Sequence, residues 1–143
     1  MATFVKINDF VEAVAEKKHN LGSDTLTVAL SNTAPASETN NPTADGKGVL
    51  ANVTQVSYTN LSAREITTSS SAQTSGTYKL VLTDLVLTAS GAVGPFRYVY
   101  IYNDTATNDE LICNYDYGSA VTLANGDTFT LDFDGTNGLL QIA

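Results

Sequence analysis

The sequence predicts a mainly β protein: an antiparallel β-sandwich or small barrel of about seven to eight strands, with one amphipathic helix near the N-terminus. From Asp24 onward apolar and polar residues alternate, which is typical of strands with one buried face. Clusters of Asn, Gly, Ser and Pro separate these runs, as turns do. Only 15% of the residues are charged, and the Thr that replaces them favours strands.

The length indicates a single domain over residues 1–143, because 143 residues with 43% hydrophobic content suffice for one core. Within it we expect a helix at 7–21, a polar surface loop at 33–48 and a β-body at 49–143. No apolar run approaches the roughly 20 residues that span a bilayer, so no membrane partner is expected. The N-terminus does not resemble a signal peptide, which predicts folding in a reducing cytoplasm.

The helix prediction rests on an apolar stripe at helical spacing, followed by basic residues. Lys17, Lys18 and His19 place positive charge near the C-terminal end, which the helix dipole favours. Gly22 stands where a left-handed cap is expected. The stripe consists of Ile7, Phe10, Val11, Val14, Ala15 and Leu21.

The strand pattern begins at TLTVALSN, where Leu26, Val28 and Leu30 share a face and Thr25 and Thr27 are expected to be exposed. SSSAQTSG is interpreted as a polar turn, followed by a strand at 78–82 and a change of register near Asp84. VLANVTQVSYTN fits either a helical turn or a strand. Near the C-terminus, Asn125-Gly126 predicts a hairpin that pairs Val121 and Leu123 with Phe129, Leu131 and Phe133.

A row of tyrosines occupies GPFRYVYIYNDT, residues 94 to 105. Alternation places Phe96, Tyr98, Tyr100 and Tyr102 on one face and Arg97, Val99, Ile101 and Asn103 on the other. Because both faces are substantially apolar, we expect a central strand whose tyrosine hydroxyls reach the rim. A stacking platform for a ligand is the competing interpretation, although the chain lacks the Trp that carbohydrate platforms usually contain.

Composition and motifs argue against several functions. The net charge of −8 and scattered basic residues argue against a nucleic-acid partner. His19 is expected at an exposed or capping position, and Cys113 as a small core hydrophobe, so no catalytic arrangement is indicated. Neither a phosphate-binding nor a dinucleotide motif is present. The sequence therefore predicts no enzyme and no cofactor; among the carboxylates, nothing singles out a catalytic pair from Asp104, Asp109, Glu110 and Asp116.

One segment, DFDGTNG at residues 132–138, contains oxygen ligands suited to calcium. Asp132, Asp134 and Asn137 would supply them, and Gly135 would permit a sharp turn. The EF-hand spacing is absent and strands are expected on both sides, so a plain turn is favoured and no metal is assigned.

The order of motifs resembles that of small structural proteins encoded by tailed bacteriophages. The resemblance begins in FVEAVAEKKHNLGSDTLTVALSNTAP and continues through YTNLSAREIT, SAQTSGTYKLVL, LTASGAVGPFRYVYIYNDT and YDYGSAVTLANGDTFTLDFDG. It covers nearly the whole chain in order, but these are fold-wide segments rather than a catalytic signature. The loop SETNNPTADGKG is longer than the linkers of that family.

The resemblance implies a non-enzymatic virion protein present in many copies, with the major capsid protein or other virion proteins as partners. The acidic β-body and long loop favour a decoration (cement) protein that stabilises the head; a tail component and a carbohydrate-binding module are the alternatives. A homo-oligomer, with a trimer favoured, is expected. The candidate subunit interface comprises Phe4, Tyr98, Tyr100, Tyr102, Tyr115 and Tyr117. The candidate capsid-contacting loop residues are Pro35, Glu38, Asn41, Pro42, Asp45 and Lys47.

Overall fold

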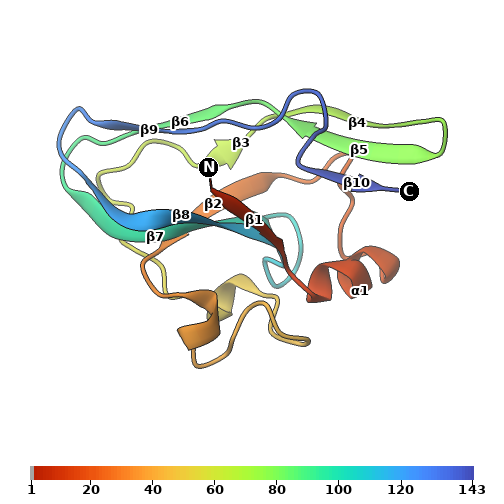
Figure 1. Cartoon of the computed structure of the whole chain (residues 1–143), viewed down its shortest axis with the longest axis horizontal. Coiled ribbons are helices and arrows are strands. Elements are labelled where there is room, and N and C mark those ends of the chain that lie inside the picture. Colours follow the sequence, from red (N-terminus) through yellow and green to blue (C-terminus); the bar gives the residue numbers. More distant parts are fainter. Residues whose placement is uncertain (1) are drawn as a thin grey trace.

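A computed structural model describes residues 2–143 as layered antiparallel β-structure with one α-helix (Figure 1). The chain also contains two short 3₁₀ turns, η1 (Pro35–Ser37) and η2 (Leu50–Asn52). The regular elements are β1 (Thr3–Lys6), α1 (Asp9–Ala15), β2 (Leu26–Ser31), β3 (Glu65–Ile66), β4 (Thr68–Thr74), β5 (Thr77–Leu82), β6 (Leu85–Thr88), β7 (Val93–Asn103), β8 (Leu111–Leu123), β9 (Thr128–Leu131) and β10 (Leu140–Ile142).

The strands form three sheets that stack in two layers (Figure 1). One layer is a five-stranded sheet in the order β1-β8-β7-β2-β3, and the other contains β10-β5-β4 and the ribbon β6-β9. The prediction of a mainly β, antiparallel fold is confirmed. The number of strands is higher than predicted, and the sheets stay open, so the barrel alternative is wrong.

The two central strands, β2 and β7, are buried on both faces. Leu26, Val28 and Leu30 are 0–1% exposed, as the alternation predicts. Thr27, which was expected at the surface, is only 6% exposed. The reason lies in the segment 33–61, which runs beneath the five-stranded sheet, on the side away from the other layer (Figure 1). Alternation alone shows one buried face and cannot reveal that a loop covers the other.

The helix is shorter than predicted and follows a strand instead of opening the chain. It spans Asp9–Ala15, and the chain turns at Lys17, which adopts a left-handed φ of 62°. The Lys17 N–H donates to Val14 O at 3.2 Å and the Lys18 N–H to Ala13 O at 2.8 Å. This hydrogen-bond pattern is a Schellman cap, so Lys17 occupies the position predicted for Gly22.

The apolar stripe predicted too long a helix, because two of its six residues lie outside α1. Ile7 is buried in the approach to α1 and Leu21 in the turn after it. Within α1, the buried residues are Phe10 and Ala13, whereas Val11 is 55% exposed.

The polar stretch SSSAQTSG is mostly strand and not turn. Its residues 69–74 belong to β4, which forms the outer edge of its sheet and pairs with β5 from Thr68↔Leu82 to Thr74↔Thr77. Only Ser75 and Gly76 make the reversal, both with positive φ. A polar edge strand needs no apolar face of its own, so alternation gives no signal for it. VLANVTQVSYTN, which the sequence left open, contains η2 and no strand.

The C-terminal hairpin prediction is wrong in its pairing. The Asn125-Gly126 turn forms, with the Asp127 N–H donating to Ala124 O at 3.0 Å. However, β9 pairs with β6, from Leu85↔Leu131 to Thr88↔Thr128, and not with β8. Two bonds at Ala89 hold the turn to the end of β6: Ala89 N–H to Asp127 O, and Gly126 N–H to Ala89 O. The chain therefore crosses from one layer to the other at this turn.

Candidate functional site

The clearest exposed apolar feature is a group of aromatic rings on β1, β8 and β9, which we call the aromatic surface (Phe4, Tyr115, Tyr117 and Phe129). Phe4 lies opposite Tyr115 in the β1–β8 pairing, with ring centroids 5.5 Å apart and edge to face. Tyr117 meets Phe129 in the same way at 5.4 Å. Phe4 is 41% and Tyr117 50% exposed, so water reaches much of both rings.

The other predicted interface tyrosines lie inside the chain. Tyr98, Tyr100 and Tyr102 are 9%, 0% and 4% exposed. The register pairs Val99 with Tyr115, which places the tyrosine row on the opposite face of the sheet from the aromatic surface. The expected central position of this strand is confirmed, since β7 pairs with β2 and β8. Its hydroxyls do not all reach the rim, because Tyr100 Oη is buried and has no hydrogen-bond partner among the described residues.

Groups from the segment 33–64 surround this row. Burial raises the pKa of the Tyr100 hydroxyl, and the neighbouring Glu38 raises it further. Burial likewise raises the pKa of Tyr102, while nearby Arg64 opposes the shift. The Arg64 guanidinium lies 3.7 Å from the centroid of the Tyr58 ring. The Tyr58 hydroxyl in turn accepts the Leu30 N–H at 2.9 Å and fastens the segment to β2. The tyrosine row is thus a packing surface inside the chain.

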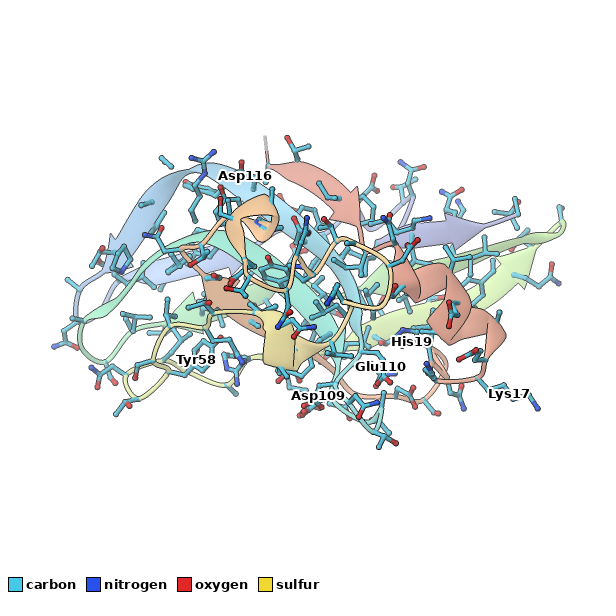
Figure 2. All side chains as sticks on the ribbon, turned by 90° about the horizontal axis from the view of Figure 1, so that it is seen from below. Lys17, His19, Tyr58, Asp109, Glu110 and Asp116 are labelled. Atoms are coloured by element: carbon cyan, nitrogen blue, oxygen red, sulfur yellow. The ribbon has the colours of Figure 1, made fainter. Side chains whose placement is uncertain are left out.

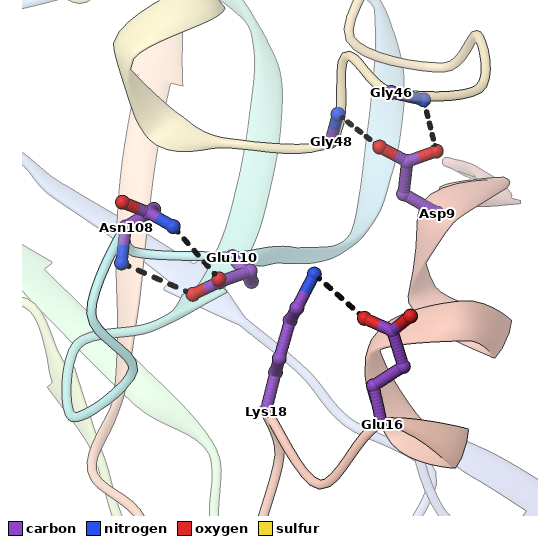
Figure 3. Close-up of polar contacts among 7 residues, drawn as sticks. All are labelled: Asp9, Glu16, Lys18, Gly46, Gly48, Asn108 and Glu110. Atoms are coloured by element: carbon purple, nitrogen blue, oxygen red, sulfur yellow. Dashed lines mark hydrogen bonds and ion pairs between the residues drawn. The ribbon is translucent and has the colours of Figure 1, made fainter.

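The loop 33–48 is anchored at both ends and is not a free extension. The Asp9 carboxylate of α1 accepts the N–H groups of Gly46 and Gly48, as Figure 3 shows. Glu38 accepts Thr54 N–H at 2.9 Å and the Thr54 hydroxyl at 2.8 Å. Gly48 lies so close to α1 that a Cβ there would meet Asp9 Cβ at 2.6 Å. These contacts hold the loop against the body of the protein.

The predicted loop residues therefore differ in accessibility. Pro42 is buried, and Pro35, Glu38, Asn41 and Lys47 are half-buried. Asn41 is engaged locally, since its Oδ1 accepts from the N–H and the hydroxyl of Thr43. Only Asp45 among the six is fully at the surface.

A second candidate site is a polar cluster between the turn after α1 and the end of β7, centred on His19 and Asn103. His19 is 8% exposed, so the predicted exposed position is wrong. Asn103 Oδ1 accepts the N–H groups of Thr105 and Ala106 at 3.0 and 3.1 Å, which fixes the orientation of its amide. Its Nδ2 donates to Asp24 Oδ2 at 2.6 Å and faces His19 Nδ1 at 3.0 Å. Because the amide nitrogen can only donate, His19 Nδ1 accepts and the ring carries its proton on Nε2.

The electrostatics of this cluster keep the imidazole neutral. Burial lowers the pKa of His19, and the carboxylates of Glu110 and Asp24 oppose this shift without reversing its direction. Figure 2 shows His19 next to Glu110, and His19 Nε2 is buried without a partner among the described residues. Phe10 covers the ring at a centroid distance of 5.2 Å. The cluster joins the turn after α1 to the β7–β8 turn.

Of the carboxylates considered for glycosidase chemistry, Asp104, Asp109 and Glu110 lie near one another and Asp116 lies apart. Glu110 is buried and accepts from Asn108 N and Nδ2 at 3.2 and 3.3 Å (Figure 3). Burial raises the pKa of Asp109, and Asp104 and Glu110 add to the effect. Asp116 lies away from this group (Figure 2) in a bidentate pair with Arg97, at 2.7 and 2.8 Å. A shallow polar hollow beside Glu110 is lined by Lys17, Lys18, Asn20, Asp24, Thr105, Ala106 and Thr107.

In the segment considered for calcium binding, the Asp134 carboxylate oxygens accept hydrogen bonds within the turn instead. Asp134 Oδ1 accepts the N–H groups of Thr136 and Asn137, and Oδ2 accepts Asn137 Nδ2, each at 2.8 Å. These bonds lower the pKa of Asp134. Over residues 2–143, no group of three or more His, Cys, Asp or Glu side chains is arranged to hold a metal ion.

Cys113 is fully buried in β8, as predicted for a core residue. Burial raises the pKa of its thiol, which disfavours the nucleophilic thiolate. Within the part of the chain that the structure describes, no helix is long and apolar enough to cross a bilayer.

Comparison with known proteins adds no relative: no family model, no curated protein and no solved structure matches the chain. The assignment of a function therefore depends on the residues and surfaces described above. Sequence reasoning missed the His19–Asn103 cluster and the Asp9 anchor, because their partners are 84 and 37 or 39 positions apart. Local patterns contain no signal for such pairs.

Proposed function

We propose that this chain is a non-enzymatic structural protein of a tailed-bacteriophage virion, a β-sandwich subunit that decorates and stabilises the assembled head. The quoted segments that resemble such proteins support the proposal. Its partners would be the major capsid protein or other virion proteins, and many copies would act together, with no cofactor and no nucleic acid. The protein would be made in the host cytoplasm and reside in the virion.

The observation that carries the proposal is the aromatic surface. The chain has a net charge of −8, yet Phe4 is 41% and Tyr117 50% exposed, each packed against another aromatic ring. Contiguous exposed apolar patches of this kind commonly mark protein contacts. Asp116, between Tyr115 and Tyr117 in sequence, lies on the opposite face of β8 and is paired with Arg97. Lys6 shares the face of Phe4 on β1, so a protein partner that covers this surface also meets one cation there.

The anchored loop supports the same proposal in a modified form. Since Asp9, Thr54 and Asn52 hold residues 38–48 in place, a capsid would meet a rigid loop and not a flexible arm. Preorganised loops lose less entropy on binding than mobile ones. The exposed residues Thr39, Asn40, Asp45 and Gly46 are the ones available for contact.

Binding to purified heads tests the proposal. The heads come from the phage whose genome encodes the chain, and co-sedimentation measures the bound fraction. We expect Tyr117→Ser to weaken binding by about tenfold or more, because an aromatic anchor at an interface contributes 1–2 kcal/mol or more. Val86→Ser is the matched control, since Val86 is 51% exposed but lies on β6, outside the aromatic surface. Wild-type protein that fails to bind heads would refute the proposal.

A tail component is the second candidate, and the open sheet edges favour it. β1, β3, β4 and β10 each end a sheet, and subunits that join through such edges build rings or tubes. Electron microscopy of the purified protein separates the two: rings or tubes support a tail component, whereas small closed oligomers support head decoration.

A further inference from the structure

Four strands end the two larger sheets, and β1 differs from the other three. All four of its residues are exposed, with Phe4 at 41% on one face and Val5 at 37% on the other. β3 has only two residues, β4 consists of Thr, Ser, Ala and Gln, and β10 has three residues. Short or polar edges resist pairing, whereas an apolar edge with free backbone groups promotes it.

The backbone of β1 shows which groups are free. The N–H of Ile7, just after the strand, donates to Ile112 O at 3.1 Å, so residue 7 points its backbone groups towards β8. Hydrogen-bonding direction alternates along an antiparallel strand. Thr3 and Val5 therefore also face β8, and Phe4 and Lys6 direct their N–H and C=O groups outward. No strand within residues 2–143 lies on that side.

From these observations we infer that β1 pairs antiparallel with β1 of a second copy of this chain, across a twofold axis at Val5. The occupant follows from the geometry, because an antiparallel strand pair is self-complementary under a twofold axis. A twofold axis perpendicular to the sheet leaves every side chain on the face that it already occupies. The two residues of each facing pair must lie on the same face, so their numbers are both even or both odd. With Val5 on the axis, Phe4 exchanges both backbone hydrogen bonds with Lys6 of the second copy, and the reverse pair does the same.

Charge favours a second copy at this edge. Fifteen acidic and seven basic residues make most contacts between two copies repulsive. β1 itself contains one Lys and no acid, and Asp116, the carboxylate opposite Thr3, is paired with Arg97 at 2.7 Å. In the inferred register each Lys6 lies beside Phe4 of the other copy and away from the other Lys6. The two five-stranded sheets become one continuous sheet of ten strands, with Phe4 and Tyr115 of both copies on one face.

The inference adds to one part of the proposed function, the association of many copies of the chain, and it rests on that part alone. Capsid binding and strand pairing can therefore fail separately. It replaces the expected trimer with a twofold contact, which by itself gives dimers.

Cross-linking at Val5 tests the register. Val5 faces β8 with its backbone, so across the axis it forms a non-hydrogen-bonded pair, whose Cα atoms lie about 4.5 Å apart and suit a disulfide. We expect Val5→Cys to give a disulfide-linked dimer under mild oxidation. Wild type is the first control, because its one cysteine, Cys113, is fully buried. Val86→Cys, at an exposed position on β6, is the second. A linked fraction no larger for Val5→Cys than for Val86→Cys would overturn the inference.

A backbone substitution tests the pairing without a cross-link. Lys6→Pro removes an outward N–H and leaves every bond to β8, whereas Lys6→Ala removes the same side chain and keeps the N–H. Sedimentation velocity from about 1 to about 200 µM, with any tag at the C-terminus, follows the assembly. We expect dimers for wild type and Lys6→Ala, and at least about tenfold weaker association for Lys6→Pro. A wild-type monomer throughout, or a trimer that Lys6→Pro leaves intact, would overturn the inference; circular dichroism confirms that each variant is folded.

Discussion

His19, the one histidine of the chain, makes folding stability depend on pH. Burial lowers its pKa below the ordinary 6.5, despite the opposing charges of Glu110 and Asp24, and Lys18 lowers it further. The unfolded chain therefore binds a proton at a higher pH than the folded chain does. The contribution of His19 to stability is complete above pH 6.5 and is lost as the pH drops below it, by at most about 1.4 kcal/mol per pH unit.

Urea unfolding between pH 6.5 and about pH 5 measures this effect. His19→Gln keeps an acceptor for Asn103 but cannot titrate, so we expect a flatter pH dependence in the variant. Asp116 and Asp134 do not interfere, because their pKa values are lowered and they titrate in more acidic solution. Equal slopes for the two proteins would contradict the assigned protonation state.

Two tyrosines test what a buried hydroxyl contributes. Tyr100 Oη is buried without a partner among the described residues, whereas Tyr58 Oη accepts Leu30 N–H and donates to Gln55 Oε1, both at 2.9 Å. We expect Tyr100→Phe to change the free energy of unfolding by less than about 0.5 kcal/mol or to raise it. Tyr58→Phe should cost about 1–3 kcal/mol, because it leaves the fully buried Leu30 N–H unsatisfied. Chemical denaturation of both variants checks the contrast.

At the scale of elements, the turn between β9 and β10 depends on one glycine. Gly138 has a φ of 79°, and a Cβ there would meet Leu80 O of β5 at 2.5 Å. Gly138→Ala should therefore cost about 1–3 kcal/mol and loosen the β5–β10 pairing. Gly135, in the same turn, has nothing within 4 Å of an added Cβ, so Gly135→Ala is the control that we expect to be nearly neutral. Thermal unfolding that ranks the two variants in the opposite order would contradict this.

The elements also show how far the sequence predicts this fold. Period-two alternation identifies β2 and the central β7 correctly, because apolar residues there pack against neighbouring strands. The same logic gives no signal at β4, where polar side chains face water on an edge strand. The sequence correctly predicts a turn at Asn125-Gly126. It does not predict that β9 then joins the other layer, where the Phe129 ring packs against Phe96 with centroids 5.1 Å apart.

The candidate site was only partly predictable for the same reason. Phe4 and Tyr117 are exposed and suit an interface, while Tyr98, Tyr100 and Tyr102 are buried. Their burial depends on the segment 33–61, whose apolar residues Val53, Val56 and Tyr58 join the core. Nothing in the tyrosine pattern itself shows that a distant loop covers it.

At the scale of the whole molecule, one hydrophobic cluster connects both layers. It includes Val28 and Ile101 of the five-stranded sheet and Leu80, Leu87 and Leu131 of the other layer. We therefore expect the 143-residue chain to unfold as one cooperative unit. Thermal unfolding followed by far-ultraviolet circular dichroism and by tyrosine fluorescence should give coincident midpoints. Two separated transitions would contradict the prediction of a single domain.

Four buried or half-buried tyrosines make the fold sensitive to alkali and give an optical readout of that sensitivity. Burial is the main cause that raises the pKa values of Tyr58, Tyr100, Tyr102 and Tyr115 above the ordinary 10. These phenols ionise more readily in the unfolded chain, so their contribution to stability is complete below pH 10 and is lost as the pH rises past it. Absorbance of the tyrosinate ion should then increase in a slow phase that matches the rate of unfolding, since the buried phenols deprotonate only once water reaches them. A single instantaneous increase for all seven tyrosines would show that these four are open to solvent.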